Sequence, residues 1–144
     1  MRPFPPVQDL VPHAAPALAL DELLACADGT AEAAITITDD TMYCHDGRAD
    51  AVLALELMAQ TVAACLGYEA FCGGVGVRVG MVIACRKLEL LRDAFAVGER
   101  LRSRVVRVHG SDDVSMFATE LFAGDGALAA RATMTLVHAS SPPA

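Results

Sequence analysis

The sequence lacks the residue groupings that mark a metal centre or a disulfide framework. Its five cysteines are scattered, their number is odd, and none belongs to a Cys-x-x-Cys pair. The four histidines lie far apart, and none has a second candidate ligand at the spacing of a helix or a zinc knuckle. We therefore expect free thiols in a reducing compartment and no bound metal.

Positive charge and long apolar runs are also scarce. The net charge of −7 argues against general nucleic-acid binding, because neutralising phosphates requires an excess of clustered Lys and Arg. No apolar run is long enough to cross a membrane, and the first residues lack the apolar stretch of a secretory signal. The sequence thus predicts a cytoplasmic protein without nucleic-acid or membrane partners.

Length and apolar content indicate one domain in an oligomer. The 144 residues suffice for one sizeable core, and 54% of them are hydrophobic, more than one subunit is expected to hide. We expect a single domain over residues 1–138, at least a homodimer, and a disordered tail over residues 139–144, where Ser-Ser-Pro-Pro occurs.

Charge is distributed unevenly along the chain. Between Gly76 and Gly110 there are eight basic residues against three acidic ones. Such a run can receive a phosphate or an acidic partner protein, whereas its more usual meaning is the solvated face of a strand.

Residues 50–67 predict one long helix around which the rest of the chain is organised. Ala, Leu, Met, Glu and Gln dominate this stretch, and all of them favour helices. Asp50 is expected to accept an unpaired backbone N–H at the helix start, and Gly67 is expected to end the helix. Apolar residues occupy almost every side, so the helix should be covered on most sides.

Glu56 and Gln60 interrupt this apolar helix, one turn apart on the same face. A carboxylate in apolar surroundings is costly unless it is paired, hydrogen-bonded or neutralised. One interpretation places Glu56 at the helix edge, or bonded to Gln60 or to a neighbouring strand. The other makes Glu56 a catalytic acid or base. Sequence spacing alone does not choose between them.

The flanking regions predict strands. Residues 30–38 alternate between an apolar and a polar face, and residues 79–90, 99–109, 114–123 and 127–138 form an antiparallel meander. Residues 17–25 predict a first strand, with a helix as the alternative. Residues 39–49 show no hydrophobic period and predict a loop. A sheet of about five or six strands must then curl around the one long apolar helix. This α+β arrangement is the hotdog fold.

Several motifs resemble those of the hotdog β-hydroxyacyl-acyl-carrier-protein dehydratases of fatty acid synthesis. Val11-Pro12-His13-Ala14-Ala15-Pro16, followed by Asp21, is similar to their Leu-Pro-His-Arg-x-Pro opening. Leu55-Glu56-Leu57-Met58-Ala59-Gln60 is similar to their central Glu-x-Met-Ala-Gln. The likeness continues through Gly80 to Arg86 and Val97-Gly98-Glu99-Arg100-Leu101, and within the superfamily the chain looks closest to the dehydratase-like proteins of aryl-polyene pathways.

The resemblance implies a site and a substrate. Glu56 would be a catalytic carboxylate in a tunnel between two subunits, acting on a 3-hydroxyacyl thioester. Phosphopantetheine of an acyl carrier protein or of coenzyme A would carry that thioester, and no other cofactor is implied. Ala51, Val52, Met58 and Gln60 would contact the substrate, with backbone N–H groups at the helix start polarising the thioester carbonyl. Gln60 would orient Glu56 or belong to the family's packing.

The loop before the helix departs from the family. The dehydratases have Gly-His-Phe-Pro fourteen residues before the helix Glu, whereas Met42 stands at that distance here and the candidate His45 is eleven residues back. His45 would be the second catalytic group or an ordinary loop histidine, with Asp46 and Asp50 as other polar candidates. Three functions stay open: a 3-hydroxyacyl thioester dehydratase, a hotdog thioesterase that uses Glu56, and a non-catalytic acyl-binding subunit paired with an active dehydratase.

Overall fold

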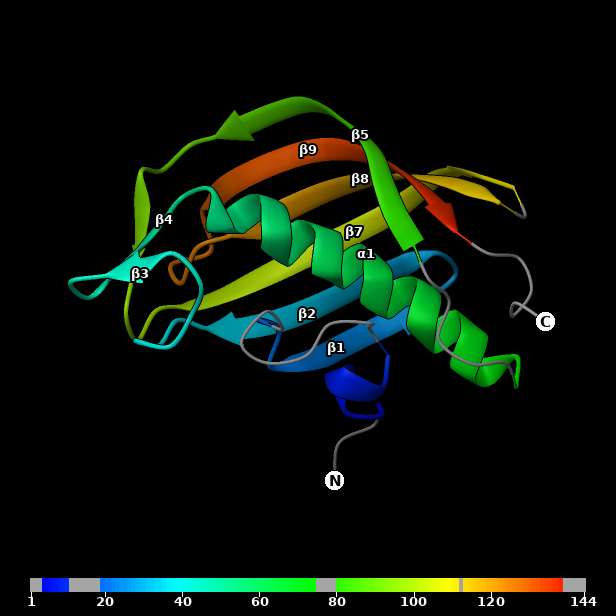
Figure 1. Cartoon of the computed structure of the whole chain (residues 1–144), viewed down its shortest axis with the longest axis horizontal. Coiled ribbons are helices and arrows are strands. Elements are labelled where there is room, and N and C mark those ends of the chain that lie inside the picture. The colour runs from blue at the N-terminus through cyan, green and yellow to red at the C-terminus, as the bar shows by residue number, and fades with distance from the viewer. Residues whose placement is uncertain (1–3, 11–18, 75–79, 112, 139–144) are drawn as a thin grey trace.

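One long helix lies across the concave face of a six-stranded antiparallel sheet (Figure 1). The computed structural model describes residues 4–10, 19–74, 80–111 and 113–138. The described elements are η1 (Val7–Asp9), β1 (Glu22–Ala27), β2 (Thr30–Thr36), β3 (Cys44–His45), β4 (Arg48–Asp50), α1 (Leu53–Cys72), β5 (Gly80–Leu90), β6 (Ala94–Ala96), β7 (Arg100–Gly110), β8 (Val114–Phe122) and β9 (Leu128–His138). The large sheet has the order β1-β2-β7-β8-β9-β5, and β3, β4 and β6 form a second, three-stranded sheet.

Alternation of side chains explains why the sheet wraps the helix. In β8 every second residue is buried, and the fully buried Phe117 and Leu121 face the helix side. The same period buries Ala31, Ala33 and Ile35 of β2. The predicted hotdog fold is confirmed, because one apolar helix fills the concave face that these alternating strands present.

The helix is displaced from its predicted bounds at both ends. It begins at Leu53, with Val52 in the capping position, and it continues to Cys72. Asp50 still accepts a backbone N–H, from Val52 at 2.9 Å, but it does so in a turn that precedes the helix. The prediction that Gly67 ends the helix is wrong. Gly67 is buried inside it, where a Cβ would collide with the carbonyl oxygen of Leu10.

The N-terminal segment therefore packs directly on the helix. Leu10 is fully buried, and its backbone approaches Gly67 so closely that only glycine fits there. Farther along, the backbone N–H of Ala19 donates to the side chain of Gln60 at 2.9 Å. Two points of α1 are thus covered by the chain that precedes the first strand.

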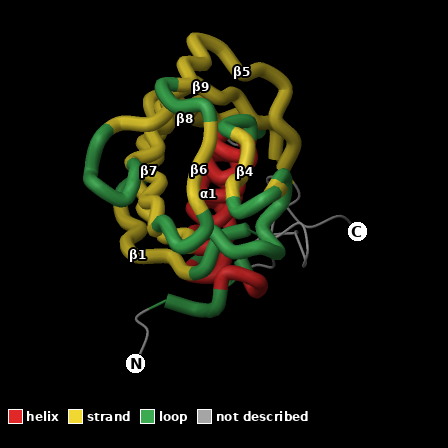
Figure 2. The backbone as a smooth tube through the Cα atoms, turned by 90° about the vertical axis from the view of Figure 1, so that its left-hand side faces the viewer, coloured by secondary structure: helices red, strands yellow, loops and turns green. Residues whose placement is uncertain are grey.

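The three-stranded sheet replaces most of the predicted loop over residues 39–49. Asp46 and Gly47 both have positive φ, 53° and 78°, which is the backbone of a tight hairpin turn between β3 and β4. The Asp-Gly pair is the hairpin signal that the sequence interpretation missed. Seen from the side, β4 and β6 lie across one end of the helix while the large sheet curves around it (Figure 2).

A partly buried ion pair stabilises the connection between the two sheets. Glu99 accepts hydrogen bonds from Arg92 at 2.6 and 3.0 Å and from the backbone N–H groups of Ala96 and Gly124. The bond from Arg92 lowers the pKa of the Glu99 carboxyl, and the backbone donors act in the same direction. Glu99 thereby fixes the turn that leads from β6 into β7.

The remaining strand predictions differ from the structure by a few residues. The four strands expected as a meander begin and end within one residue of their expected bounds, as β5, β7, β8 and β9. The predicted order is wrong for the first of them, because β5 pairs with β9 at the edge of the sheet and not with β7. The predicted first strand is found at Glu22–Ala27, later than expected, and part of its expected range lies outside the described residues. The tail over residues 139–144 also lies outside them.

Candidate active site

The first turns of α1 present a carboxylate held by an amide. Gln60 donates from Nε2 to Oε1 of Glu56 at 3.0 Å, and it accepts the backbone N–H of Ala19 on its Oε1 at 2.9 Å. Gln60 is completely buried, whereas Glu56 is half-buried. The structure thus brings together two of the predicted site residues, Glu56 and Gln60.

The backbone of Ala19 fixes which way the Gln60 amide points. A backbone N–H only donates, so the Gln60 atom facing Ala19 must be the oxygen. The NH₂ group is then turned towards Glu56, where it donates to the carboxylate. No residue-type signal marks a backbone N–H, and the role of Ala19 could not be found from the sequence.

Glu56 lies on a stripe of α1 that the chain's own sheet leaves open. Val52, Leu55, Glu56 and Ala59 follow one another at helical spacing, and all four are exposed or half-buried. Val52 is 42% exposed, which is unusual for a large apolar residue beside a core. The carboxylate therefore stands on an apolar surface that is accessible from one side.

His45 lies elsewhere, on the three-stranded sheet. Its side chain is exposed at the end of β3, beside the turn made by Asp46 and Gly47. Among the described residues no hydrogen bond joins His45 to Glu56 or Gln60. Asp46 is likewise exposed in the turn, and Asp50 is engaged with Val52. Within this single chain the candidate histidine faces outward.

The other predicted substrate contacts, Ala51, Val52 and Met58, are already engaged in hydrogen bonds within the chain. The N–H of Ala51 donates to the carbonyl of Asp93 at 3.0 Å, and the N–H of Val52 donates to Asp50, so neither amide is available to polarise a thioester carbonyl. Met58 is fully buried, and its sulfur accepts a hydrogen bond from Thr119 at 3.3 Å. In this chain Met58 is a core residue, and its contact with an acyl group stays a prediction.

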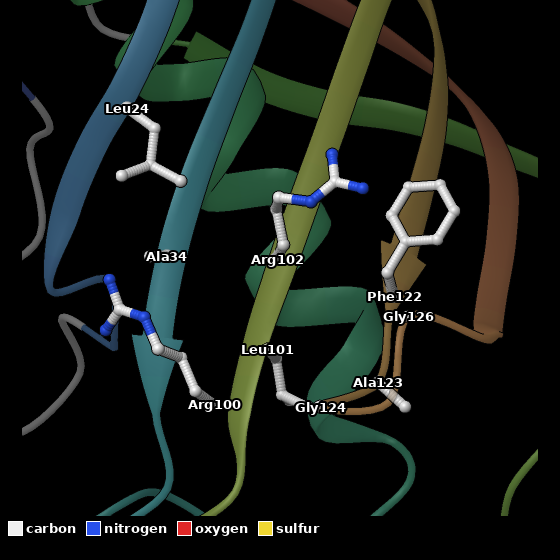
Figure 3. A pocket seen from close by; sticks show the side chains of 9 residues that line it. All are labelled: Leu24, Ala34, Arg100, Leu101, Arg102, Phe122, Ala123, Gly124 and Gly126. Carbon is white, nitrogen blue, oxygen red and sulfur yellow. The ribbon is translucent and has the colours of Figure 1, made fainter.

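Two arginines of the basic run line a surface hollow, and both are paired with carboxylates. On the outer face of the large sheet, Arg100 and Arg102 border a shallow hollow of about 260 Å³, with Leu24 and Phe122 beside them (Figure 3). Arg100 pairs with Glu22 at 2.9 Å and Arg102 with Glu32 at 2.6 Å. These pairs support the interpretation of the run as a solvated strand face.

The described part of the chain has neither a metal-binding cluster nor a membrane-spanning helix. No three of its His, Cys, Asp and Glu side chains come together as a metal site requires. None of its helices is both long and apolar enough to span a membrane.

Comparisons with known proteins agree with this architecture. The family model of ApeP-like proteins, described as ApeP dehydratase, matches residues 5–143. The dehydratase heterocomplex ApeI:P from Xenorhabdus doucetiae superposes with a TM-score of 0.87 at 20% identity, covering 97% of this chain and 93% of that one. A hypothetical thioesterase with coenzyme A from Streptococcus pneumoniae TIGR4 superposes with a TM-score of 0.67 at 14% identity, covering 85% of this chain and 88% of that one. The PaaI protein of E. coli superposes with a TM-score of 0.61 at 15% identity, covering 81% of both chains. The curated proteins contain no match to the sequence.

Proposed function

Because the chain belongs to the ApeP-like dehydratase family, we propose that it removes water from a 3-hydroxyacyl thioester carried on phosphopantetheine. The reaction takes a proton from C2, breaks the C3–O bond and releases the hydroxyl as water, leaving a 2-enoyl thioester. One group must accept the C2 proton and one must protonate the departing hydroxyl. Glu56 is proposed to carry one of these two proton transfers.

The observation that supports this role is the arrangement of Glu56, Gln60 and Ala19. Glu56 is half-buried on the open apolar stripe, and Gln60 holds one carboxylate oxygen with its amide. The apolar residues of the stripe beside the carboxylate suit an acyl group, because the acyl carbons lose contact with water there.

The open stripe also suggests that a second subunit completes the site. Strand β5 ends the large sheet, so one of its edges is unpaired within the described residues (Figure 1). Its large apolar residues are exposed on both faces of the strand, namely Val82, Ile83, Leu88 and Leu90. A long apolar edge strand is a template for pairing with another chain. We propose that β5 pairs with the same strand of a second hotdog subunit.

The identity of that subunit is open between two proteins. It is a second copy of this chain, or it is a different dehydratase subunit, as the name of the ApeI:P heterocomplex states for that assembly. The substrate carrier is proposed to be an acyl carrier protein, with coenzyme A as the other source of the same phosphopantetheine arm. The exposed His45 would reach the substrate only where a second subunit covers its surface.

Mass spectrometry of synthetic thioesters tests this proposal. The protein is incubated alone, and with a candidate partner subunit, on 3-hydroxyacyl thioesters of carrier protein and of coenzyme A. We expect the loss of one water from the thioester. Release of free acid instead would identify a thioesterase. An unchanged thioester that stays bound to the protein would identify an acyl-binding subunit.

The exposure of His45 specifically favours the acyl-binding subunit as the second candidate. A dehydratase without a second titratable group in reach of its substrate lacks one of its two proton carriers. The variant His45→Ala distinguishes the cases once an active assembly is in hand. Loss of dehydration assigns His45 to the site of this chain, whereas full turnover means that another group transfers the second proton.

The β5 interface is tested by charge substitution. Ile83→Glu should dissociate the assembly, because a carboxylate would be buried against an apolar partner strand. Val108→Glu is the matched control, since Val108 in β7 is equally exposed, 56% for both residues, but lies away from the β5 edge. Sedimentation velocity of both variants measures the outcome. A β5 variant that sediments as the unmodified protein would exclude this edge as the interface.

A further inference from the structure

Two cysteines from distant parts of the chain meet beside the second half of the helix. Cys26 lies in β1 and Cys65 in α1, and their sulfur atoms are 3.8 Å apart. A disulfide requires about 2.05 Å between the sulfurs, so these two sulfurs, already in contact, must approach further to bond. The described cysteines are all free thiols, and this pair is distinguished from Cys44, Cys72 and Cys85 by its contact.

The surroundings divide the two thiols into an attacking and a resolving partner. Cys26 is half-buried, whereas Cys65 is buried completely. The hydrogen bond with Cys65 lowers the pKa of the Cys26 thiol, and it outweighs burial and the Glu69 carboxylate, which raise that pKa. The Arg107 guanidinium acts in the lowering direction. The same hydrogen bond and burial raise the pKa of Cys65. Cys26 is thus the more accessible and the more readily ionised thiol of the pair.

Arg107 is held in place by its own partners. Its guanidinium makes two hydrogen bonds to Glu69, at 2.9 and 2.5 Å, and lies over the ring of Phe117 at 5.1 Å. Its Nε atom is buried without a hydrogen-bond partner among the described residues. The positive charge beside the thiol pair is therefore a fixed part of the fold and not a mobile surface group.

We propose that Cys26 and Cys65 form a modification site at which a hydroperoxide closes a reversible disulfide between β1 and α1. The Cys26 thiolate attacks the peroxide oxygen, the O–O bond breaks, and the leaving oxygen takes up a proton, which leaves a sulfenic acid on Cys26. The sulfur of Cys65 then attacks the sulfur of Cys26. The Cys65 proton and the Cys26 hydroxyl depart as water. The two sulfurs are oxidised by two electrons in total, and the peroxide is reduced.

The bond would cross-link elements that are 39 residues apart in sequence. Closing such a loop restricts the unfolded chain more than the folded one, so the oxidised protein should resist urea better than the reduced protein. Glu56 lies more than two turns away on the same helix. Closure of the disulfide is thus expected to leave the position of the candidate carboxylate unchanged.

Native oxidation followed by peptide mapping tests the site. The reduced protein is titrated with hydrogen peroxide, quenched with an alkylating agent and digested. We expect the peptide pair that contains Cys26 and Cys65, lighter by two hydrogen atoms, to form before Cys72 or Cys85 is modified. Cys65→Ser should leave a sulfenic acid on Cys26 that dimedone traps, and Cys26→Ser should leave Cys65 unmodified.

Cys85→Ser is the matched control, because Cys85 is exposed and does not touch another described thiol. It should form the disulfide at the rate of the unmodified protein. Earlier modification of Cys72 or Cys85, or alkylation of Cys26 and Cys65 as separate thiols after peroxide treatment, would overturn the proposal. The map of the unmodified protein decides the question even where a variant fails to fold.

Discussion

The two halves of α1 differ in what they are fastened to. The first half has an open apolar stripe with Glu56 on it, and its one buried polar side chain that faces the site, Gln60, is held by a backbone N–H. The second half is fastened by side chains and by close packing: Gly67 against Leu10, and Glu69 against Arg107. One half leaves surface for a ligand or a partner, and the other half secures the helix to its own domain.

This difference shows how an apolar helix can carry a carboxylate and still stay packed against its own domain. A half-buried charge destabilises the segment around it unless other contacts compensate. The compensation is placed more than three turns away, where Gly67 is buried against Leu10 and Glu69 forms an ion pair with Arg107. Substitutions in the first half should therefore affect activity, and substitutions in the second half should affect stability.

The largest effect is expected at Glu56. Glu56→Gln should lower the dehydration rate about 10²–10⁴-fold, because an amide cannot transfer the proton. The free energy of unfolding should stay equal or rise, since the variant no longer places a carboxylate on an apolar face. Turnover and urea denaturation, measured on the same preparation, should diverge. Full turnover in this variant would remove Glu56 from the proposed site.

Gly67→Ala should give the largest loss of stability. The added methyl group collides with backbone of the N-terminal segment, which cannot move aside as a flexible side chain would. We expect a loss of about 3 kcal/mol or more in the free energy of unfolding, the range typical of overpacking in a core. Gly73→Ala is the control, because a Cβ at the helix end would meet its nearest neighbour at 3.4 Å. Equal denaturation midpoints for the two variants would contradict the close crossing at Leu10.

Gln60→Leu removes the buried amide from the first half of α1. The change leaves the Ala19 N–H without its acceptor and should cost about 1–3 kcal/mol in the free energy of unfolding. Glu56 also loses a donor, so turnover should fall with stability in this variant. Thr61→Val is the control, since the buried Thr61 hydroxyl donates only to the carbonyl of Leu57 in its own helix. Unchanged turnover in Gln60→Leu would reduce Gln60 to a packing residue.

Glu69→Gln should have the smallest effect, and only on stability. It is the counterpart of Glu56→Gln on the same helix, and it weakens the paired bonds to Arg107. Because Glu69 is 36% exposed and water screens the pair, the expected loss is about 1 kcal/mol or less. Turnover should be unchanged. A fall in turnover larger than the fall in stability would mean that the second half of the helix takes part in the site.

The fold was largely predictable because the patterns of apolar residues in its strands and helix are regular. The alternation in β2 and β9 and the apolar content of α1 each follow from side-chain burial, which a sequence displays directly. The helix end was not predictable from Gly67. Glycine there serves a tertiary crossing with Leu10, and such a role has the same sequence signature as a helix stop.

The site was predictable only in part, for a physical reason. Glu56 and Gln60 were recognisable as polar residues on an apolar helix, and their hydrogen bond follows from helical spacing. The hairpin that carries His45 was not recognised, because two short strands bury little and show almost no period. The exposure of His45 depends on tertiary structure, which residue types alone do not encode.

The packing of the N-terminal segment on α1 has a consequence for the order of folding. Residues that precede β1 dock on a helix that follows β1 in the chain, and the N–H of Ala19 has its acceptor in a residue 41 positions downstream. Contacts that close such long loops are entropically slow to form and are commonly absent from the folding transition state. The start of the chain is therefore expected to dock late, after helix and sheet have met. Gly67→Ala should then speed unfolding while it leaves the folding rate almost unchanged.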